Sequence, residues 1–222
     1  MSPVSPLLDV QDIYFMQDGT TLLQPVSLTL NAGESLLVTG PSGSGKSTLL
    51  KILASLLEPS GGQILFKGRP SGSIRPEHYR QRVSYCFQTP VLFGETVYDN
   101  LALPWQIRKK TVDSARIRDG LRQMSLPETI LAKKPEQLSG GEKQRVGLLR
   151  NLQFLPDVLL LDEITSALDE ENRQRINQLI ASLAAEQGVA TVSISHDVAE
   201  IRQAKRLLTL PQPGGSHIDE SA

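Results

Sequence analysis

The sequence has 222 residues, enough for one domain with a sizeable hydrophobic core. Its formal net charge of −1, with 21% charged residues, argues against a polyanionic partner, so no nucleic acid is expected to bind. The sequence contains no run of the roughly 18–20 apolar residues that a membrane span needs, and no signal peptide is expected after Met1. The single cysteine, Cys86, excludes an internal disulfide and fits a reduced cytoplasmic compartment.

The N-terminal part of the sequence has the pattern of β-structure. Apolar residues alternate over residues 8–15 and 26–30, and a turn signal at Asp18 and Gly19 separates these two predicted strands. The apolar run 35–39 predicts a buried parallel strand that ends in a glycine-rich turn. Leucines at helical spacing over residues 49–57 then predict a helix, which a Pro-Ser-Gly-Gly segment ends.

Strands and helices alternate in the rest of the sequence. The patterns predict strands over residues 63–67, 83–87, 158–161 and 189–194, and a helix over residues 172–185. Residues from 96 to about 150 have helical spacing, and we place a helical lobe at about 89–148. This alternation predicts a largely parallel sheet with right-handed crossovers. The tail, residues 211–222, is rich in Pro, Gly, Ser and acidic residues and is expected to be flexible.

Residues 40–47 match the pattern G-x-x-x-x-G-K-[ST]. Glycines let backbone amides wrap around phosphate oxygens, and the helix start adds its positive end. We expect Lys46 to reach the β- and γ-phosphates and the Ser47 hydroxyl to hold Mg²⁺. A flexible Gly/Ser loop is the alternative, but chance gives this pattern in about 1% of chains of this length. The predicted phosphate cradle consists of Gly40, Pro41, Ser42, Gly43, Ser44, Gly45, Lys46, Ser47 and Thr48.

Two acidic residues follow the buried strand 158–161. Asp162 suits the coordination shell of Mg²⁺, and Glu163 can act as the general base that polarises an attacking water. An ordinary strand followed by a polar loop would have the same local sequence. The functional interpretation therefore depends on the phosphate cradle upstream.

Residues 138–145 read Leu-Ser-Gly-Gly-Glu-Lys-Gln-Arg, so a serine and two glycines open a predicted helix. Such a helix start can hold phosphate oxygens, although Ser139 and Glu142 would also form a simple capping box. The segment resembles the signature motif of the ABC ATPase family, in which the signature of one subunit closes on the ATP of another. The resemblance implies a homodimer on ATP binding, with ATP contacted by Ser139, Gly140, Gly141 and Glu142.

Three further segments resemble motifs of this family, in the expected order. Gln88 resembles the Q-loop glutamine, which contacts Mg²⁺, and residues 166–169 resemble the D-loop. His196 resembles the switch histidine at the γ-phosphate, although a lone histidine at a strand end is more often structural. The resemblance implies an α/β fold with a P-loop NTPase (RecA-like) core, a mostly parallel sheet, an N-terminal antiparallel β subdomain and an ABC-type helical subdomain. It implies one domain, residues 7–210, whose core comprises about 7–88 and 149–210.

The sequence departs from the family pattern at two places. Gln17 stands where an aromatic residue usually stacks on adenine, and Tyr14 or Phe15 is a candidate replacement. Ile164 follows Glu163 where proline is common, which changes the stiffness of the loop and leaves the chemistry the same.

The resemblance implies that the chain binds and hydrolyses ATP with Mg²⁺ and energises a membrane transporter. A separate transmembrane permease would dock near residues 91–105, where Tyr98 and Trp105 are candidate anchors unless they pack the core of the lobe. Similarity is strongest to subunits of small bacterial exporters, which implies export of iron or another metal ion and a peripheral position on the cytoplasmic face of the bacterial inner membrane.

Two other functions remain as alternatives. The first is a soluble ABC ATPase that acts on nucleic acid or the ribosome. Such proteins commonly carry coiled-coil insertions, zinc ribbons or a second cassette, none of which is visible in the sequence. The second is a P-loop kinase, which would leave residues 138–145 unexplained.

Overall fold

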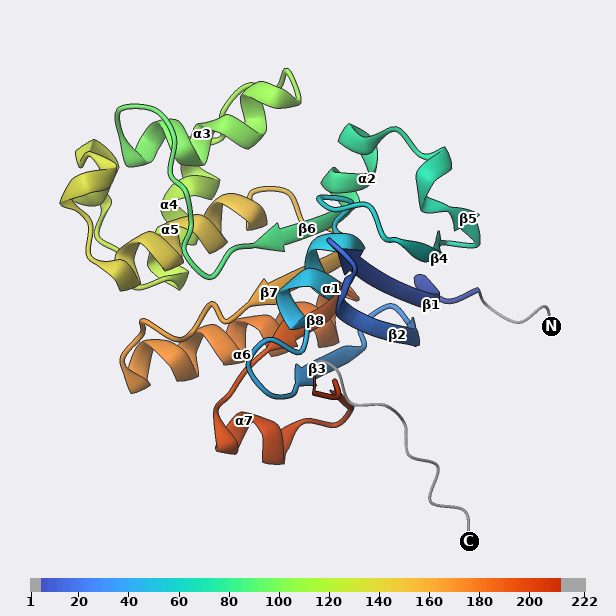
Figure 1. Cartoon of the computed structure of the whole chain (residues 1–222). Coiled ribbons are helices and arrows are strands. Elements are labelled where there is room, and N and C mark those ends of the chain that lie inside the picture. Colours follow the sequence, from blue (N-terminus) through green and yellow to red (C-terminus); the bar gives the residue numbers. More distant parts are fainter. Residues whose placement is uncertain (1–4, 213–222) are drawn as a thin grey trace, which may run out of the picture.

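Four strands from the N-terminal part of the chain form an antiparallel sheet. The computed structural model describes residues 5–212 and orders this sheet β2-β1-β4-β5 (Figure 1). Its strands are β1 (Leu8–Gln17), β2 (Thr20–Leu30), β4 (Gly61–Phe66) and β5 (Arg69–Pro70). Leu8 lies opposite Leu30 of β2 and Phe66 of β4, and all three side chains are buried. The structure therefore confirms the strands predicted from the alternating apolar pattern, because every second residue of a strand faces the core.

A second sheet is parallel throughout and follows the order β6-β7-β8-β3-β9. Its strands are β3 (Ser35–Thr39), β6 (Val83–Cys86), β7 (Val158–Asp162), β8 (Ala190–Ile194) and β9 (Leu207–Thr209). The predicted α/β fold with a mostly parallel sheet is confirmed. The sequence analysis did not predict β9, because its three residues are too few to display a period.

Helix α1 (Lys46–Leu53) lies between the two sheets and contacts β2 on one side and β6, β7 and β8 on the other. Its buried leucines face both sheets. The helix ends earlier than the predicted limit at residue 57. Ser55 has a φ of +56°, which turns the chain out of the helix and leaves Leu56 exposed.

The remaining helices lie outside the two sheets. They are α2 (Pro76–Arg82), α3 (Val97–Ile107), α4 (Ser114–Gln123), α5 (Gly140–Leu152), α6 (Glu170–Gln187) and α7 (Val198–Gln203). Figure 1 shows α3, α4 and α5 grouped to one side of the sheets, where they form the helical lobe. Helix α5 extends to Leu152, so it crosses the boundary at 148 that the sequence suggested for this lobe. Within residues 5–212, no helix combines the length and the apolar character that a bilayer crossing requires.

Strand β7 connects two hydrophobic cores. Val158 and Leu160 belong to the core between the sheets, whereas Leu159 and Leu161 belong to the core shared with the helical lobe and α6. Because both faces of the strand are covered, its sequence is continuously apolar. Asp162 ends this run, so the first polar group of β7 appears at the edge of the sheet. Of the tail expected to be flexible, residues 213–222 lie outside the described residues.

Candidate nucleotide-binding and catalytic site

The predicted site residues other than 139–142 gather at one edge of the parallel sheet. The phosphate cradle follows β3, Gln88 follows β6, Asp162 ends β7 and is followed by Glu163, and His196 follows β8. The carboxyl ends of parallel strands meet at the same edge, and this edge is where open α/β sheets commonly bind ligands. Sheet topology therefore brings together residues that are far apart in the sequence.

Two glycines determine the path of the phosphate cradle. Gly40 has a φ of +139°, and a Cβ there would lie 2.6 Å from the backbone oxygen of Leu210. Gly45, directly before α1, has a φ of +89°, and a Cβ there would lie 2.4 Å from the backbone oxygen of Leu22. Both positions thus require glycine for conformation and for space.

Lys46 folds back over the cradle. Its Nζ donates to the backbone oxygens of Gly40 at 2.9 Å and Pro41 at 2.8 Å, so the ammonium group stands over the loop. In the same loop, the Ser44 hydroxyl is buried and has no hydrogen-bond partner within residues 5–212. The first amides of α1 also have no acceptor inside the helix. An ammonium group, a free hydroxyl and free amides are donors that fit phosphate oxygens.

The rest of the cradle differs in exposure. Pro41, Ser42 and Gly43 form its exposed rim, while Thr48 is half-buried in the first turn of α1. The cradle is therefore open toward solvent on one side and anchored in the core on the other.

Asp162 is held by two hydroxyl groups. Ser47 Oγ donates to Asp162 Oδ1 at 3.0 Å, and Tyr85 Oη donates to Asp162 Oδ2 at 2.5 Å. Burial, together with the neighbouring Asp162 carboxylate, raises the pKa of Tyr85 far above its usual value, so Tyr85 remains a donor. Ser47 and Asp162 offer the hard oxygen ligands that Mg²⁺ prefers. Sequence reasoning missed Tyr85, whose only signal is an aromatic residue with a polar tip in a predicted strand.

Glu163 is held from two sides, by the predicted Mg²⁺ contact Gln88 and by the other predicted catalytic residue, His196. Gln88 Nε2 donates to Glu163 Oε2 at 2.8 Å, and His196 Nε2 lies 3.1 Å from Glu163 Oε1. Glu163 has a φ of +49°, a conformation that residues other than glycine rarely adopt and that is frequent at functional sites. Within residues 5–212, Gln88 forms no hydrogen bond with Ser47 or Asp162, so it lies with Glu163 and not with the Mg²⁺ candidates.

Residues 139–142 form the start of α5. Ser139 Oγ accepts from the Glu142 amide at 3.1 Å, and Glu142 Oε2 accepts from the Ser139 amide at 2.8 Å, which completes a capping box. The backbone hydrogen bond from Ser139 lowers the pKa of Glu142, helped by nearby Lys133. Across the described part of the chain, no hydrogen bond or ion pair joins this segment to the phosphate cradle. The two phosphate-binding candidates are thus separate in one copy.

Helix α5 nevertheless contacts the loop that carries Gln88. Gln144 Nε2 donates to the backbone oxygen of Gln88 at 3.0 Å. A Cβ at Gly147 would lie 2.7 Å from Pro90 Cβ, so only a glycine allows the helix to approach this closely. The start of α5 and the Glu163 cluster are therefore mechanically linked through Gln144.

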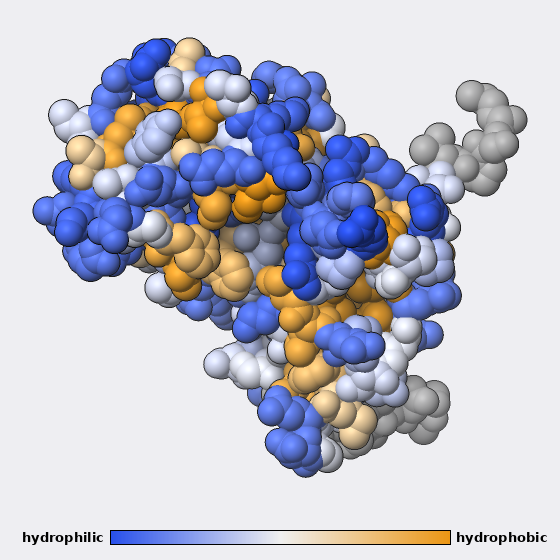
Figure 2. Space-filling model, turned by 90° about the horizontal axis from the view of Figure 1, so that it is seen from above, coloured by the Kyte–Doolittle hydropathy of each residue, from blue (hydrophilic) through white to orange (hydrophobic). Residues whose placement is uncertain are grey.

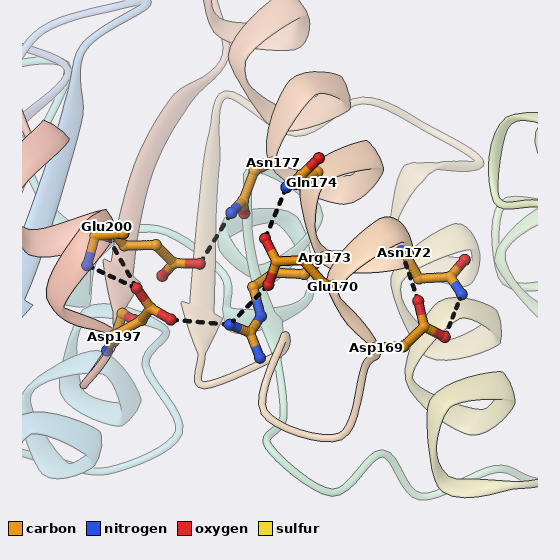
Figure 3. A network of polar contacts seen from close by, with 10 residues as sticks. Asp169, Glu170, Asn172, Arg173, Gln174, Asn177, Asp197 and Glu200 are labelled. Atoms are coloured by element: carbon orange, nitrogen blue, oxygen red, sulfur yellow. Dashed lines mark hydrogen bonds and ion pairs between the residues drawn. The ribbon is translucent and has the colours of Figure 1, made fainter.

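A polar network connects the segment after His196 to α6 (Figure 3). Arg173 of α6 pairs with Asp197 at 2.8 Å, and Asp197 caps α7 by accepting from backbone amides. These amides and Arg173 lower the pKa of Asp197. Asp169, the last residue of the predicted D-loop, caps α6 by accepting from the Asn172 amide at 2.9 Å. The sequence did not single out Arg173, because its partner lies 24 residues away.

The aromatic residues near the end of β1 are both engaged in packing. The Tyr14 ring lies over Gly61, where a Cβ would be 2.3 Å from Tyr14 Cε1, and Phe15 packs against the main core. Gln17 is exposed at the end of β1.

Trp105 is an interior residue. Only 8% of it is exposed, its Nε1 donates to Gln153 Oε1 at 3.1 Å, and its ring packs 4.6 Å from that of Phe154. Of the two alternatives for Trp105, the structure supports packing in the core of the lobe over a surface anchor, because the indole is engaged inside the lobe. Tyr98 is 40% exposed and remains available at the surface.

Comparison with known proteins gives consistent results. The profile of the family described as "ABC transporter" matches residues 23–166. The chain is 51% identical over 221 residues to the "Probable iron export ATP-binding protein FetA" of Escherichia coli (strain K12), covering 100% of this chain and 98% of that protein. A solved dimeric structure of MJ0796, a bacterial ABC transporter cassette, has a TM-score of 0.83 with 28% identity and covers 92% of this chain and 94% of that chain. A post-hydrolysis dimer of MJ0796 bound to ADP and Pi has a TM-score of 0.82 with 28% identity and covers 91% and 94%.

Proposed function

Since this chain belongs to the ABC transporter family and is an ATP-hydrolysing subunit of a transporter, we propose that it works with Mg²⁺ as a homodimer and energises a metal-exporting permease. The observation that carries the proposal is the Glu163 carboxylate, held by Gln88 and His196 beside the phosphate cradle. The alternative of a soluble ABC ATPase acting on nucleic acid or ribosomes has no comparable support, because a relative that matches over nearly its full length is named a probable iron export ATP-binding protein.

The cradle binds the triphosphate of ATP. Lys46 exchanges its two contacts with backbone oxygens for the β- and γ-phosphates, and the free Ser44 hydroxyl and the amides of α1 donate to phosphate oxygens. Ser47, Asp162 and Gln88 would hold Mg²⁺, and Gln88 would release Glu163 to do so. When bound, Mg²⁺ neutralises charge that develops on the phosphates.

Glu163 activates the attacking water. It accepts a proton from the water while the water oxygen bonds to the γ-phosphorus and the bond to the bridging oxygen breaks, giving ADP and phosphate. Before nucleotide binds, Gln88 and His196 hold the carboxylate in place, and with ATP bound His196 contacts the γ-phosphate. Because the His196 side chain is half exposed, it can move from Glu163 to the γ-phosphate.

The homodimer completes each site. One copy holds the phosphates in its cradle, and the start of α5 in the other copy, with exposed Ser139 and Gly140 and half-buried Gly141 and Glu142, covers them. Two observations support this: within residues 5–212 of one copy no hydrogen bond or ion pair joins the two segments, and the similar MJ0796 cassette is dimeric.

The permease docks against the helical lobe on the cytoplasmic face of the bacterial inner membrane. Support comes from the exposed apolar residues Val91, Phe93 and Tyr98, which follow Gln88 in the sequence and lie in the predicted docking region 91–105. The similarity to a probable iron export protein supports iron or a related metal ion as the cargo.

Replacing Glu163 with Gln tests the catalytic and dimer parts of the proposal. We expect Glu163→Gln to bind ATP, to accumulate dimers and to hydrolyse ATP at least about 100-fold more slowly, because the general base is lost. Size-exclusion chromatography with Mg²⁺ and ATP, together with phosphate release, measures both effects. Glu171→Gln, at an exposed acid of α6, is the matched control. A Glu163→Gln protein that remains monomeric and turns over normally would contradict the proposal.

Transport requires a separate experiment. The tagged full-length chain is used to isolate its membrane partner from native membranes, and the complex is placed in vesicles with ATP. We expect ATP-dependent movement of Fe²⁺ that Glu163→Gln abolishes. Movement of other metal ions only would remove the iron assignment, and the absence of any membrane partner would contradict the transporter role.

A further inference from the structure

The end of helix α3 and the three residues after it form an exposed basic corner of the helical lobe, which we call the basic tip. Ile107 ends α3, and 60% of it is exposed. Arg108, Lys109 and Lys110 follow, and none of them forms an ion pair within the part of the chain that the structure describes. A single exposed apolar residue is ordinary, but one set beside three unpaired cations has the composition of segments that lie on anionic membranes.

The backbone and one aromatic ring hold the basic tip in place. The Lys110 amide donates to the Trp105 backbone oxygen at 2.9 Å, and Lys109 has a φ of +53°, a conformation that glycine adopts more easily. Arg108 and Lys110 lie 4.3 and 5.3 Å from the centroid of the Phe154 ring. These contacts orient two of the three cations and leave the Lys109 side chain exposed.

A further cation lies on the same face of the molecule. Arg80 of α2 is exposed and has no ion-pair partner among residues 5–212, and it lines one recess together with Arg108. Figure 1 shows α2 and the end of α3 at the top of the molecule, and Figure 2 views this face, with hydrophilic side chains on both lobes around hydrophobic ones. Four unpaired cations thus share one face of a chain whose formal net charge is −1.

This face lies on the membrane side of the proposed complex. The permease is proposed to dock near residues 91–105, and the basic tip begins two residues later. A permease bound there brings the tip toward the surface of the bilayer, whereas α7 lies at the opposite end of the molecule (Figure 1).

We propose that the basic tip, together with Arg80, contacts the anionic phospholipid headgroups of the membrane around the permease. The inference rests on the transport function proposed above and adds the lipid surface as a partner. Cations close to an anionic bilayer gain from its negative surface potential, and the apolar surface of Ile107 leaves water when it enters the headgroup region. Nucleic acid also offers phosphates, but it has no apolar layer for Ile107, so a lipid surface fits better.

Binding to vesicles tests the inference. The full-length chain is mixed with vesicles of phosphatidylglycerol and phosphatidylethanolamine, or of phosphatidylcholine alone, each containing a dansyl-labelled lipid. Cosedimentation gives the affinity. Trp105 is the one tryptophan in the sequence and lies two residues before Ile107, so energy transfer from Trp105 to the dansyl groups shows whether the basic tip faces the lipid. A short DNA duplex serves as the second polyanion.

We expect wild type to bind the anionic vesicles at least about tenfold more tightly than the neutral ones, with energy transfer and with an affinity that falls as salt rises. Lys109→Glu with Lys110→Glu should lower this affinity at least about tenfold. Lys109→Gly with Lys110→Gln should also lower it, with an unchanged or higher melting temperature, because glycine suits the positive φ. Ile107→Ser should lower it about threefold without a change of charge.

The matched control is Arg202→Glu with Lys205→Glu. These two exposed cations lie in α7 and just after it, away from the basic tip, and their replacement changes the net charge by the same amount. This variant should bind the anionic vesicles as wild type does. Unchanged ATP binding by each variant shows that it is folded.

Three results would overturn the inference. They are equal binding to the two kinds of vesicles, an equal loss of binding in the α7 control, and DNA bound as tightly as the anionic vesicles. Binding to vesicles without energy transfer from Trp105 would also overturn it, because another face would then be in contact with the lipid.

Capture of the membrane partner in detergent separates the inference from the proposed function. Residues 91–105 are unchanged in the Lys109 and Lys110 variants, so these variants should capture the permease as wild type does. If they lose it in detergent, the basic tip contacts the permease, and the lipid inference is wrong while the transport function stands. If wild type captures no membrane partner, the proposed function fails, whatever the vesicles show.

Discussion

The two phosphate-binding candidates of this chain are built in different ways. The phosphate cradle belongs to a cluster held by contacts between segments far apart in the sequence, as in the hydrogen bond from Ser47 of α1 to Asp162 of β7. The start of α5 is instead satisfied by its own residues, Ser139 and Glu142. The phosphate cradle depends on tertiary contacts and the start of α5 on local contacts, so a substitution can disrupt one without the other. Comparing variants of the cradle with variants of the start of α5 therefore shows whether ATP binding and ATP hydrolysis need one copy of the chain or two.

Lys46→Ala should have the largest effect. Its two contacts with backbone oxygens place the ammonium group where the phosphates bind, and charged hydrogen bonds contribute about 1.5–3 kcal/mol each. We expect ATP affinity to fall about 10- to 100-fold in the monomer, with turnover lost as well, as measured by calorimetry. Lys51→Ala, on the exposed face of the same helix, should bind normally. Normal ATP affinity of the Lys46 variant would show that the cradle is wrongly assigned.

Gly140→Ala tests the second phosphate-binding candidate, the start of α5. A Cβ at Gly140 would lie 3.7 Å from that of Ala167, an ordinary contact, so the chain itself tolerates the change. Alanine also favours the first turn of α5 by about 0.5–1 kcal/mol. We expect unchanged ATP affinity in the monomer and equal or higher thermal stability. Turnover should nevertheless fall about tenfold or more, because the added methyl group separates the start of α5 from the other copy's ATP.

Two measurements decide this prediction. Calorimetry at low protein concentration gives the affinity of the monomer, and phosphate release at high concentration gives the turnover of the dimer. Gly72→Ala, where nothing lies within 4 Å of the added Cβ, is the control. Full turnover of Gly140→Ala would remove the start of α5 from the reaction.

The sequence was sufficient for the parts of the site that depend on local patterns. The glycines of the cradle, the acids after β7 and the capping box of α5 each follow from residue types at fixed spacing. Contacts across strands could not be predicted in this way. The hydrogen bond from Tyr85 to Asp162 joins residues 77 apart, and it depends on β6 and β7 being neighbours in the sheet. Periodicity gives no information about strand order.

Trp105 shows a second limit. An aromatic residue beside exposed apolar residues is compatible with a surface anchor or with core packing, and the sequence pattern is the same for both. The structure distinguishes the two, because the Trp105 indole donates a hydrogen bond to Gln153, which lies 48 residues away in the sequence. Helix ends were also difficult, because the positive φ of Ser55 that ends α1 has no sequence signal such as glycine or proline at that position.

Tyr85→Phe should have a smaller effect, confined to the cradle side. The substitution keeps the ring and removes the donor to Asp162 Oδ2, so the carboxylate is less firmly oriented. We expect the Mg²⁺ concentration for half-maximal turnover to rise about 3- to 10-fold, as one hydrogen bond contributes about 0.5–1.5 kcal/mol. Tyr79→Phe is a matched control, because its hydroxyl donates to the Leu53 backbone oxygen away from the site. An equal Mg²⁺ requirement in the two variants would contradict a positioning role for Tyr85.

Acid should affect the start of α5 through Glu142, with the smallest expected effect. The Ser139 amide lowers the pKa of Glu142 below its ordinary value of 4.5, so the ionised form stabilises the fold above that pH. The contribution is lost as pH falls through the lowered pKa of the folded state, and it is constant between pH 5 and 8. A capping interaction contributes about 1 kcal/mol, so the melting temperature should fall by a few degrees more in wild type than in Glu142→Gln when the pH is lowered from about 5 to 3. Glutamine keeps an acceptor for the Ser139 amide but does not titrate. If the melting temperatures of wild type and Glu142→Gln depended equally on pH, this capping box would not depend on charge.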